Sequence, residues 1–471
     1  MVASLITGNI NSYSSYNEND VNQNHLNHEE KNNSNETTTD FINHELSVNL
    51  DSSNAFEGPE KLLEIWISPT DSVLPIGCPE KGLRAIPLEG IEQLLDLVNC
   101  KILSKISTNE LDAYLLSESS LFVYTNRLVL KTCGTTATLL CLSKLQELII
   151  DHLSWPNDNV LKNIYRIFYS RRSFMFPDRQ TEIHQSWSNE LTWLNKYFPS
   201  STSKAYVVGD LSHDHWYLYL NGVNTQQSNK SSPATSSVSS PRSNSNLENG
   251  HIRNGTNGHN NYPISPIVSP KDAIPQFLAN RIARENYDGF QMDDSLELLM
   301  TELDSESASN FQLSKHENEF PSMDPAHEDY GHLLGHKMMQ TTGLDSIFDR
   351  MDVNSLKHDA FAFTPCGFSS NSIINEKYYY TLHITPEQGW SYASFETNLP
   401  NRNQSFLVNN VIEILKPNKF CLVFVRENLS NSENCLDNLI KFDLNNYTRV
   451  DKIVYDLKYD YKLLYSYYER N

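Results

Sequence analysis

The stretch Leu116-Ser117-Glu118-Ser119-Ser120-Leu121-Phe122-Val123 places a Glu-Ser-Ser step between apolar residues. A serine hydroxyl can attack the carbonyl group that precedes it, but this N-to-O acyl shift needs a distorted peptide and a polarised carbonyl. By itself, a Ser-Ser pair indicates only an ordinary strand edge or turn. The interpretation of this stretch therefore depends on the rest of the sequence.

Four further blocks accompany it. They are Phe56-Glu57-Gly58-Pro59-Glu60-Lys61-Leu62-Leu63-Glu64, Lys131-Thr132-Cys133-Gly134-Thr135-Thr136, Phe363-Thr364-Pro365-Cys366-Gly367-Phe368-Ser369 and Thr381-Leu382-His383-Ile384-Thr385-Pro386-Glu387. In this order, the five blocks resemble eukaryotic S-adenosylmethionine decarboxylase, the pyruvoyl-dependent enzyme of polyamine synthesis. The resemblance thins over about 304–350 and after Glu427.

Polar residues are concentrated in two segments of the 471-residue chain, whose hydrophobic content of 39% is low for one packed globule. Asn, Ser, Glu and His dominate 1–52, and Ser, Asn, Gly and Pro dominate 221–274. Neither segment can bury enough apolar surface to offset the entropy of ordering. We predict a disordered tail over 1–52 and a single domain over 53–471 that a disordered insert at about 221–274 interrupts.

The folded part alternates aromatic-rich strands with a few long helices, which favours an α+β fold. The predicted strands are Lys61–Ile67, Leu128–Cys133, Tyr206–Val208, Trp216–Leu220, Ser295–Glu302, Tyr378–Ile384, Trp390–Glu396 and Phe420–Val425, and the predicted helices are Gly134–Leu148, Glu182–Tyr197 and Leu407–Leu415. A Leu-Glu pair early in two of these strands, at Leu63-Glu64 and Leu296-Glu297, is a faint internal echo. The resemblance implies two similar halves in a four-layer αββα sandwich, with two antiparallel sheets flanked by helices.

The net charge of −21 argues against nucleic acid and against an anionic membrane as partners. No window approaches the ~20 apolar residues of a membrane span, and no secretory signal is apparent. The seven cysteines are odd in number and show no Cys-x-x-Cys spacing, so a reducing, cytoplasmic location is the simplest expectation.

Decarboxylation of an α-amino acid needs an electron sink that no standard side chain provides. The resemblance implies that this sink is a covalent pyruvoyl group, which the chain makes from Ser119 and which binds the substrate as a Schiff base. The hydroxyl of Ser119 attacks the Glu118 carbonyl, and the resulting ester breaks down after loss of the α-proton. The products are a β chain, 1–118, and an α chain, 119–471.

The resemblance also assigns the residues that act during processing and catalysis. His383 is the base that drives ester breakdown, and Ser369 stabilises the intermediate before it; a titratable imidazole suits this proton transfer. Cys133 is the proton donor to the substrate after decarboxylation, a role that suits a thiol of adjustable acidity. Glu57 and Glu60 match acidic residues near the active centre.

For substrate binding, Phe56 and Phe363 match the two aromatic residues that enclose the adenine of S-adenosylmethionine, where rings beside a sulfonium also gain cation–π attraction. Glu387 matches the carboxylate that binds the ribose hydroxyls. Leu116 and Glu118 match positions whose backbone meets the adenine.

A second acidic group is readable from the strands, where an inward-facing carboxylate is costly without a cation. It comprises Glu64, Asp293, Glu297 and Glu396. These acids match the family's binding site for putrescine, an activating dication, and the resemblance adds Lys131, Phe168, Ser170, Arg171 and Ser295, with Phe424 and Tyr461 as pocket aromatics. It also implies a homodimer of processed protomers.

Two alternatives lie outside this assignment. His327, His332 and His336, with Glu328, could form a metal site of a hydrolase, but the cluster lacks the Glu beside the first His of a His-Glu-x-x-His motif, and Gly331 and Gly335 weaken the helix. We therefore expect no metal. The other alternative is a catalytically inactive paralogue that regulates an active decarboxylase, against which the presence of Ser119, Cys133, Ser369 and His383 argues.

Overall fold

The structure is a computed structural model that describes residues 40–42, 60–71, 74, 77–117, 119–155, 160–174, 176–211, 214–222, 294–316, 318–320, 327, 329–349, 351, 353–387, 389, 391–400, 403–427 and 435–471. All of these belong to one unit, Thr38–Asn471. Phe41–Ile42, inside the predicted tail, form a short strand paired with Ser104–Lys105, and the strand before the predicted insert continues to Gly222.

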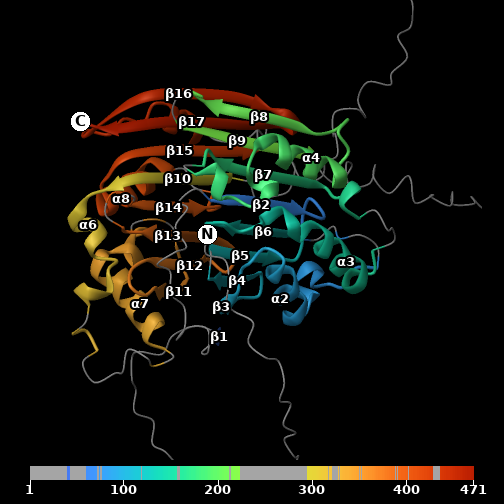
Figure 1. The fold of residues 1–471 in the computed structure, drawn as a ribbon, viewed down its shortest axis with the longest axis horizontal. Helices are drawn as coiled ribbons and strands as arrows, with labels where there is room; N and C mark the ends of the chain where they lie inside the picture. Colours follow the sequence, from blue (N-terminus) through green and yellow to red (C-terminus); the bar gives the residue numbers. More distant parts are fainter. Residues whose placement is uncertain are drawn as a thin grey trace, which may run out of the picture. The chain divides into compact units, whose positions relative to one another are not determined.

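The first sheet is antiparallel and runs in the order β1-β3-β4-β5-β6-β2-β7-β9-β8 (Figure 1). Its strands are β1 (Phe41–Ile42), β2 (Lys61–Trp66), β3 (Ile102–Ser107), β4 (Leu111–Leu116), β5 (Ser119–Tyr124), β6 (Arg127–Thr132), β7 (Arg166–Arg172), β8 (Lys204–Gly209) and β9 (His215–Gly222). Val, Leu, Ile and aromatic residues fill these strands, as their β propensity favours.

The second sheet is also antiparallel and runs in the order β11-β12-β13-β14-β10-β15-β17-β16. Its strands are β10 (Asp294–Leu303), β11 (Leu356–Ala362), β12 (Phe368–Ile374), β13 (Tyr378–Thr385), β14 (Tyr392–Thr397), β15 (Pro417–Glu427), β16 (Tyr447–Leu457) and β17 (Tyr461–Arg470). Apart from β1, the two strand orders correspond one to one, with the first strand of each half, β2 or β10, at the centre of its sheet. The prediction of two similar halves is confirmed.

Helices cover the outer face of each sheet (Figure 1). They are α2 (Leu88–Asp96), α3 (Cys141–Leu153), α4 (Trp187–Tyr197), α6 (Ser305–Ser309), α7 (Tyr330–Thr342), α8 (Gln404–Leu415) and α9 (Cys435–Ile440). Leu94 and Leu145 pack with Leu63 outside the first sheet, and Leu334 and Leu407 belong to the core outside the second. The inner faces of the two sheets meet in smaller clusters, one of which joins Phe122 to Tyr379. The four-layer αββα sandwich is confirmed.

The predicted strands are present with shifted ends, but two predicted helices begin too early. Gly134 has a φ of +60°, and the Thr136 hydroxyl donates to the Cys133 carbonyl, which holds a loop until a 3-10 turn at Thr138–Leu140 leads into α3. The helix predicted from Glu182 is a separate 3-10 turn, Glu182–His184, after which Ser186 caps α4. In the described part of the chain, no helix is long and apolar enough to cross a membrane.

Candidate active site

Ser119 opens strand β5 directly after a tight hairpin, because its cross-strand partner is Leu116 at the end of β4. Its φ is +114°, a backbone conformation that L-residues adopt only under strain. Ser119 is 1% exposed, and its hydroxyl has no hydrogen-bond partner among the described residues. Leu116 is also buried, while Glu118 lies outside the described residues. The turn therefore holds a buried hydroxyl in a strained backbone, without a hydrogen bond to the part of the chain that the structure describes.

The residue after Ser119 connects the two sheets. The Ser120 hydroxyl lies 3.0 Å from Nε2 of His383 and 2.6 Å from Oδ1 of Asn371, which it donates to. The Thr381 hydroxyl lies 2.8 Å from the same Nε2 atom, and Ser369 lies 2.8 Å from Nδ1 of His383 on the other side of the ring. The structure thus brings His383 and Ser369 together at the side chain of the residue that follows Ser119.

The imidazole of His383 is buried, and burial, with Lys131 as a second cause, holds its pKa well below the ordinary value. It is therefore neutral at physiological pH and can accept a proton. Ser120, Asn371 and Thr381 were missed by the sequence reasoning. Their signal was strand alternation, since Asn371 follows Ser369 by two in β12 and Thr381 precedes His383 by two in β13.

Cys133 follows the last residue of β6, and that residue, Thr132, pairs directly with Ser119. The cysteine is half-buried. The carbonyl group of Cys133 accepts a 2.6 Å hydrogen bond from Thr136. The register of β5 and β6 therefore brings the thiol loop next to the Ser119 turn.

Of the predicted substrate residues, Phe363 and Glu387 lie in loops at the ends of β11 and β13. Phe363 is 7% exposed and packs edge-on against Phe361, with ring centroids 5.0 Å apart. Glu387 is half-buried, burial raises its pKa, and one of its carboxylate oxygens has no partner in the described part of the chain. Phe56 and Glu57 lie outside the described residues.

Lys131 binds three carboxylates between the sheets. Its ammonium lies 2.7 Å from Glu396, 3.2 Å from Glu60 and 3.3 Å from Glu297, and all four side chains are at least 91% buried. Burial lowers the pKa of Lys131, but the three acids outweigh it and raise that pKa well above its usual value. Burial also raises the pKa of Glu60, and that of Glu297 to about 7. A single ammonium group thus faces three carboxyl groups.

A pocket opens beside this cluster. Its lining includes the predicted effector residues Glu64, Phe168, Ser170, Ser295 and Glu297, together with Tyr461. Glu64 also forms an ion pair with Arg127 at 3.2 Å. Asp293 lies outside the described residues.

Two residues matched to this pocket are elsewhere in the structure. Arg171 lies on the opposite face of β7 from Ser170, where its guanidinium binds Glu190 at 2.8 Å. Phe424 packs in the core on the helix side of the second sheet. The structure therefore does not bring these two side chains to the pocket.

The described residues contain no group of three or more His, Cys, Asp or Glu side chains that could hold a metal ion. His332 is fully buried and lies 3.0 Å from the Ala360 carbonyl, and burial lowers the pKa of His336. Glu328 lies outside the described residues.

Comparisons with known proteins identify the family of the chain. Residues 53–469 match the family model for adenosylmethionine decarboxylase. The chain is 39% identical over 443 residues to the S-adenosylmethionine decarboxylase proenzyme of Saccharomyces cerevisiae, covering 91% of this chain and 96% of that protein. It is 32% identical to the proenzyme of Drosophila melanogaster, covering 78% and 82%. A solved structure, the Trypanosoma brucei AdoMetDC-delta26 monomer, aligns at a TM-score of 0.43 and 18% identity over 74% of this chain and 99% of that one. The chain belongs to the adenosylmethionine decarboxylase family.

Proposed function

We propose that this chain decarboxylates S-adenosyl-L-methionine to S-adenosylmethioninamine and carbon dioxide, using a pyruvoyl group that it makes from Ser119. The observation that carries the proposal is the buried hydroxyl of Ser119 on a strained backbone, next to Ser120, which contacts His383. The direct test is the release of carbon dioxide from carboxyl-labelled S-adenosylmethionine by the purified protein. An uncut, inactive chain would instead favour a regulatory paralogue.

The residues at the turn suit formation of this group. Attack by the Ser119 hydroxyl on the Glu118 carbonyl forms a C–O bond and breaks the C–N bond, giving an ester. Loss of the Ser119 α-proton then expels the Glu118 carboxylate, and water releases ammonia from the dehydroalanine that remains, leaving a pyruvoyl group at residue 119. The positive φ of Ser119 supports the first step because it lowers the cost of distorting the peptide.

His383 and Ser369 act on the second step in this proposal. A neutral imidazole can accept the α-proton, and Ser369 and Ser120 hold the ring through its two nitrogens. Bonds on both sides fix the orientation of the ring between the sheets. These contacts support an imidazole that acts as a base without first losing a proton itself.

In turnover, the pyruvoyl carbonyl supplies the electron sink for the departing carboxylate group. Cys133 holds the proton that returns to the substrate Cα, Phe363 stacks on the adenine, and the partnerless oxygen of Glu387 accepts from the ribose hydroxyls. Because the structure pairs none of the seven cysteines in a disulfide, we assign the reaction to the reducing cytosol.

Putrescine fits the pocket beside Lys131 as an activator. The three carboxylates that share the single ammonium of Lys131 leave an excess of negative charge that a diamine dication would balance. Coupling to the active site has a short route, because Lys131 pairs across the sheet with Ser120, which contacts His383. Ser295, in β10, lines the same pocket, and the resemblance to the family adds Asp293 to the proposed site.

Replacing Glu297 with glutamine should weaken activation by putrescine by about tenfold or more in half-activating concentration, because one anionic partner is lost. Asp293→Val should abolish the response. In the wild type, the half-activating concentration should rise as the pH falls from about 8 to about 6, since Glu297, with its pKa of about 7, becomes protonated there. Carbon dioxide release with and without putrescine measures all three.

Glu302→Gln is the matched control, because Glu302 lies at the exposed end of the same strand and pairs with Lys419. It should respond to putrescine like the wild type. An unchanged response in Glu297→Gln and Asp293→Val would remove the effector from this pocket.

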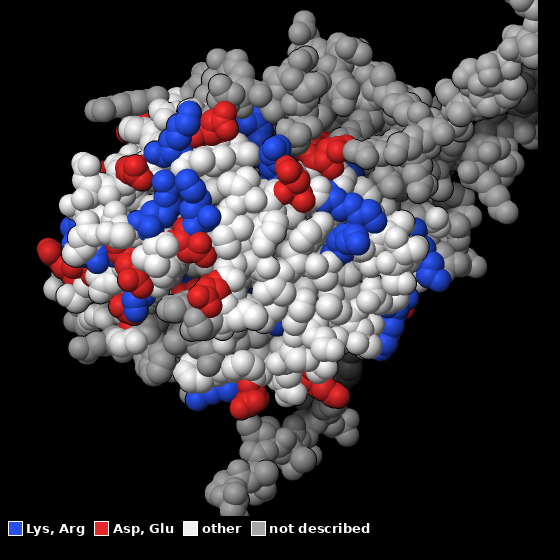
Figure 2. Space-filling model, turned by 90° about the horizontal axis from the view of Figure 1, so that it is seen from above, with Lys and Arg blue, Asp and Glu red and all other residues white. Residues whose placement is uncertain are grey.

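The edge strands β8 and β16 support a homodimer. They end the two sheets side by side, and they expose Val207, Val450, Val454 and Tyr455. Figure 2 views this side and shows charged side chains around a broad uncharged area. Exposed apolar edge strands are commonly covered by another chain.

Val454→Glu should convert the dimer to a monomer, because a carboxylate would be buried without a partner at the contact. Light scattering after size exclusion would measure the mass. Leu211→Glu is the control, since Leu211 is 72% exposed outside the strands and should leave the mass unchanged. A monomeric wild type, or a dimeric Val454→Glu protein, would contradict this contact.

A further inference from the structure

Lys61 is a fully buried lysine that none of the roles above uses. It opens β2, and its ammonium donates to the Gly134 carbonyl at 2.9 Å and to Oε1 of Gln180 at 3.2 Å. The side-chain amide of Gln180 donates to the same Gly134 carbonyl at 3.2 Å. Two donors from distant parts of the chain therefore converge on the carbonyl of the residue that follows Cys133.

Lys61 also contacts the Cys133 loop through its backbone. Thr132, the residue before Cys133, pairs with Lys61 on one side and with Ser119 on the other. On the loop itself, Thr136 binds the Cys133 carbonyl. Lys61 therefore contacts the residues on both sides of Cys133. Its backbone pairs with Thr132, and its ammonium binds the Gly134 carbonyl.

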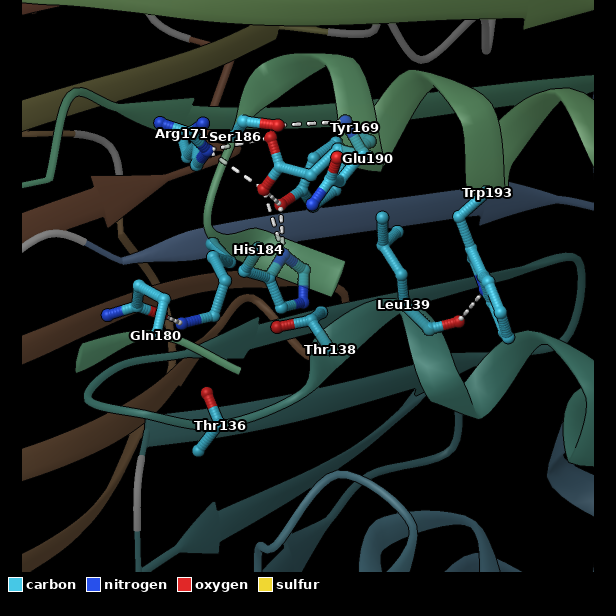
Figure 3. A network of polar contacts seen from close by, with 12 residues as sticks. Thr136, Thr138, Leu139, Tyr169, Arg171, Gln180, His184, Ser186, Glu190 and Trp193 are labelled. Carbon is cyan, nitrogen blue, oxygen red and sulfur yellow. Dashed lines mark hydrogen bonds and ion pairs between the residues drawn. The ribbon is translucent and has the colours of Figure 1, made fainter. Parts of the chain in front are cut away.

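The ammonium of Lys61 has no carboxylate within ion-pair distance in the described part of the chain. The charge of Glu190 acts on Lys61, but the Glu190 carboxylate already has other partners, among them Arg171 and His184 (Figure 3). Arg171 donates to both of its oxygens, Tyr169 donates to it at 2.6 Å, and Nδ1 of His184 lies 2.8 Å away. The charge of Glu190 is therefore matched by that of Arg171.

The surroundings of Lys61 affect its charge. Burial lowers the pKa of Lys61 to about 8; Cys133, Glu190 and Cys100 oppose this, and Arg171 adds to it. His184 is neutral, because burial lowers its pKa to about 4. Lys61 is thus a desolvated cation at neutral pH that faces the thiol loop, and it loses its charge as the pH rises through about 8.

We propose that Lys61 is a positioning residue for Cys133, whose ammonium fixes the thiol loop and stabilises the thiolate that proton donation leaves behind. This rests on the proposed role of Cys133 as proton donor. A thiol that gives up a proton becomes an anion, and a buried cation stabilises that anion more than a cation in solvent does. Lys61 would therefore favour proton delivery by Cys133.

The test is the rate at which iodoacetamide alkylates Cys133, followed by peptide mass, because this readout needs neither the pyruvoyl group nor turnover. At about pH 7, Lys61→Gln should slow alkylation roughly threefold or more, since it removes the charge and keeps a donor. Lys61→Arg should stay near the wild-type rate. Cys366, half-buried in the loop after β11, is the internal reference in each sample.

Gln180→Leu separates charge from loop anchoring, because it removes the second donor to the Gly134 carbonyl and keeps the Lys61 ammonium. Its Cys133 alkylation should stay within about twofold of the wild type. Equal alkylation rates in the wild type and Lys61→Gln, or an equal loss in Gln180→Leu, would overturn the proposal. A Cys133→Ala protein with full turnover would remove the proton-donor role, while the effect of Lys61 on alkylation would still stand.

Discussion

Replacing Ser119 with alanine is expected to leave a single uncut chain of 54.0 kDa without decarboxylase activity. The wild type should instead yield fragments of about 13 and about 41 kDa, from a cut after residue 118 at ~115 Da per residue. The physical reason is that alanine keeps the turn but removes the only atom that can attack the preceding carbonyl. A denaturing gel with intact mass measures both chains.

Ser117→Ala is the matched control, because Ser117 lies in the same turn and its hydroxyl only accepts a hydrogen bond from the backbone of Lys101. This variant should be cut and active. An uncut wild type would contradict the pyruvoyl assignment, and so would cleavage of the Ser119→Ala chain at the same bond. Loss of folding is excluded if Ser119→Ala keeps the circular dichroism of the wild type.

Replacing His383 with alanine is expected to slow self-cleavage by about 10²–10⁴-fold, the usual contribution of a positioned base. Processing should stop at the ester, since the attack by Ser119 does not need the α-proton to leave. Hydroxylamine cleaves esters far faster than amides, so brief treatment of the purified variant should release both fragments. A time course on a denaturing gel, with and without hydroxylamine, gives the measurement.

His358→Gln is the control for this change, because His358 is half-buried in the same sheet but lies 2.8 Å from Ser372 instead of Ser120. It should be cut at the wild-type rate. The wild-type rate should also stay level as the pH falls to about 6.5, because the pKa of His383 lies well below that value and its imidazole remains unprotonated. A rate that fell over this range, or a fully cut His383→Ala chain, would argue against this base.

Strand alternation made much of the fold predictable. In β2, alternate residues face the helices and the opposite sheet, and the continuous apolar run predicted a strand covered on both sides. The first residues of the helices were harder to predict from the sequence. The loop before α3 depends on a positive φ at Gly134 and on side-chain bonds of Thr136, which override the apolar period of the sequence.

Site residues that belong to a sequence motif were predicted. Site residues whose contacts cross from one sheet to the other were missed. Ser120 meets Asn371 across 251 positions of sequence, a distance that no local pattern encodes. Arg171 is a different case. Because adjacent residues of a strand point to opposite faces, Ser170 and Arg171 could not both line one pocket, and alternation alone could have separated them.

The central place of β2 in the first sheet bears on what the proposed cut can do. This strand precedes residue 118, yet it is hydrogen-bonded on both sides to β6 and β7, which follow the cut. In the same way, β4 remains paired with β5 across the broken turn. The two products would therefore stay interlaced by strand pairing without a covalent link, and separating them would require unfolding the sheet that holds the active site.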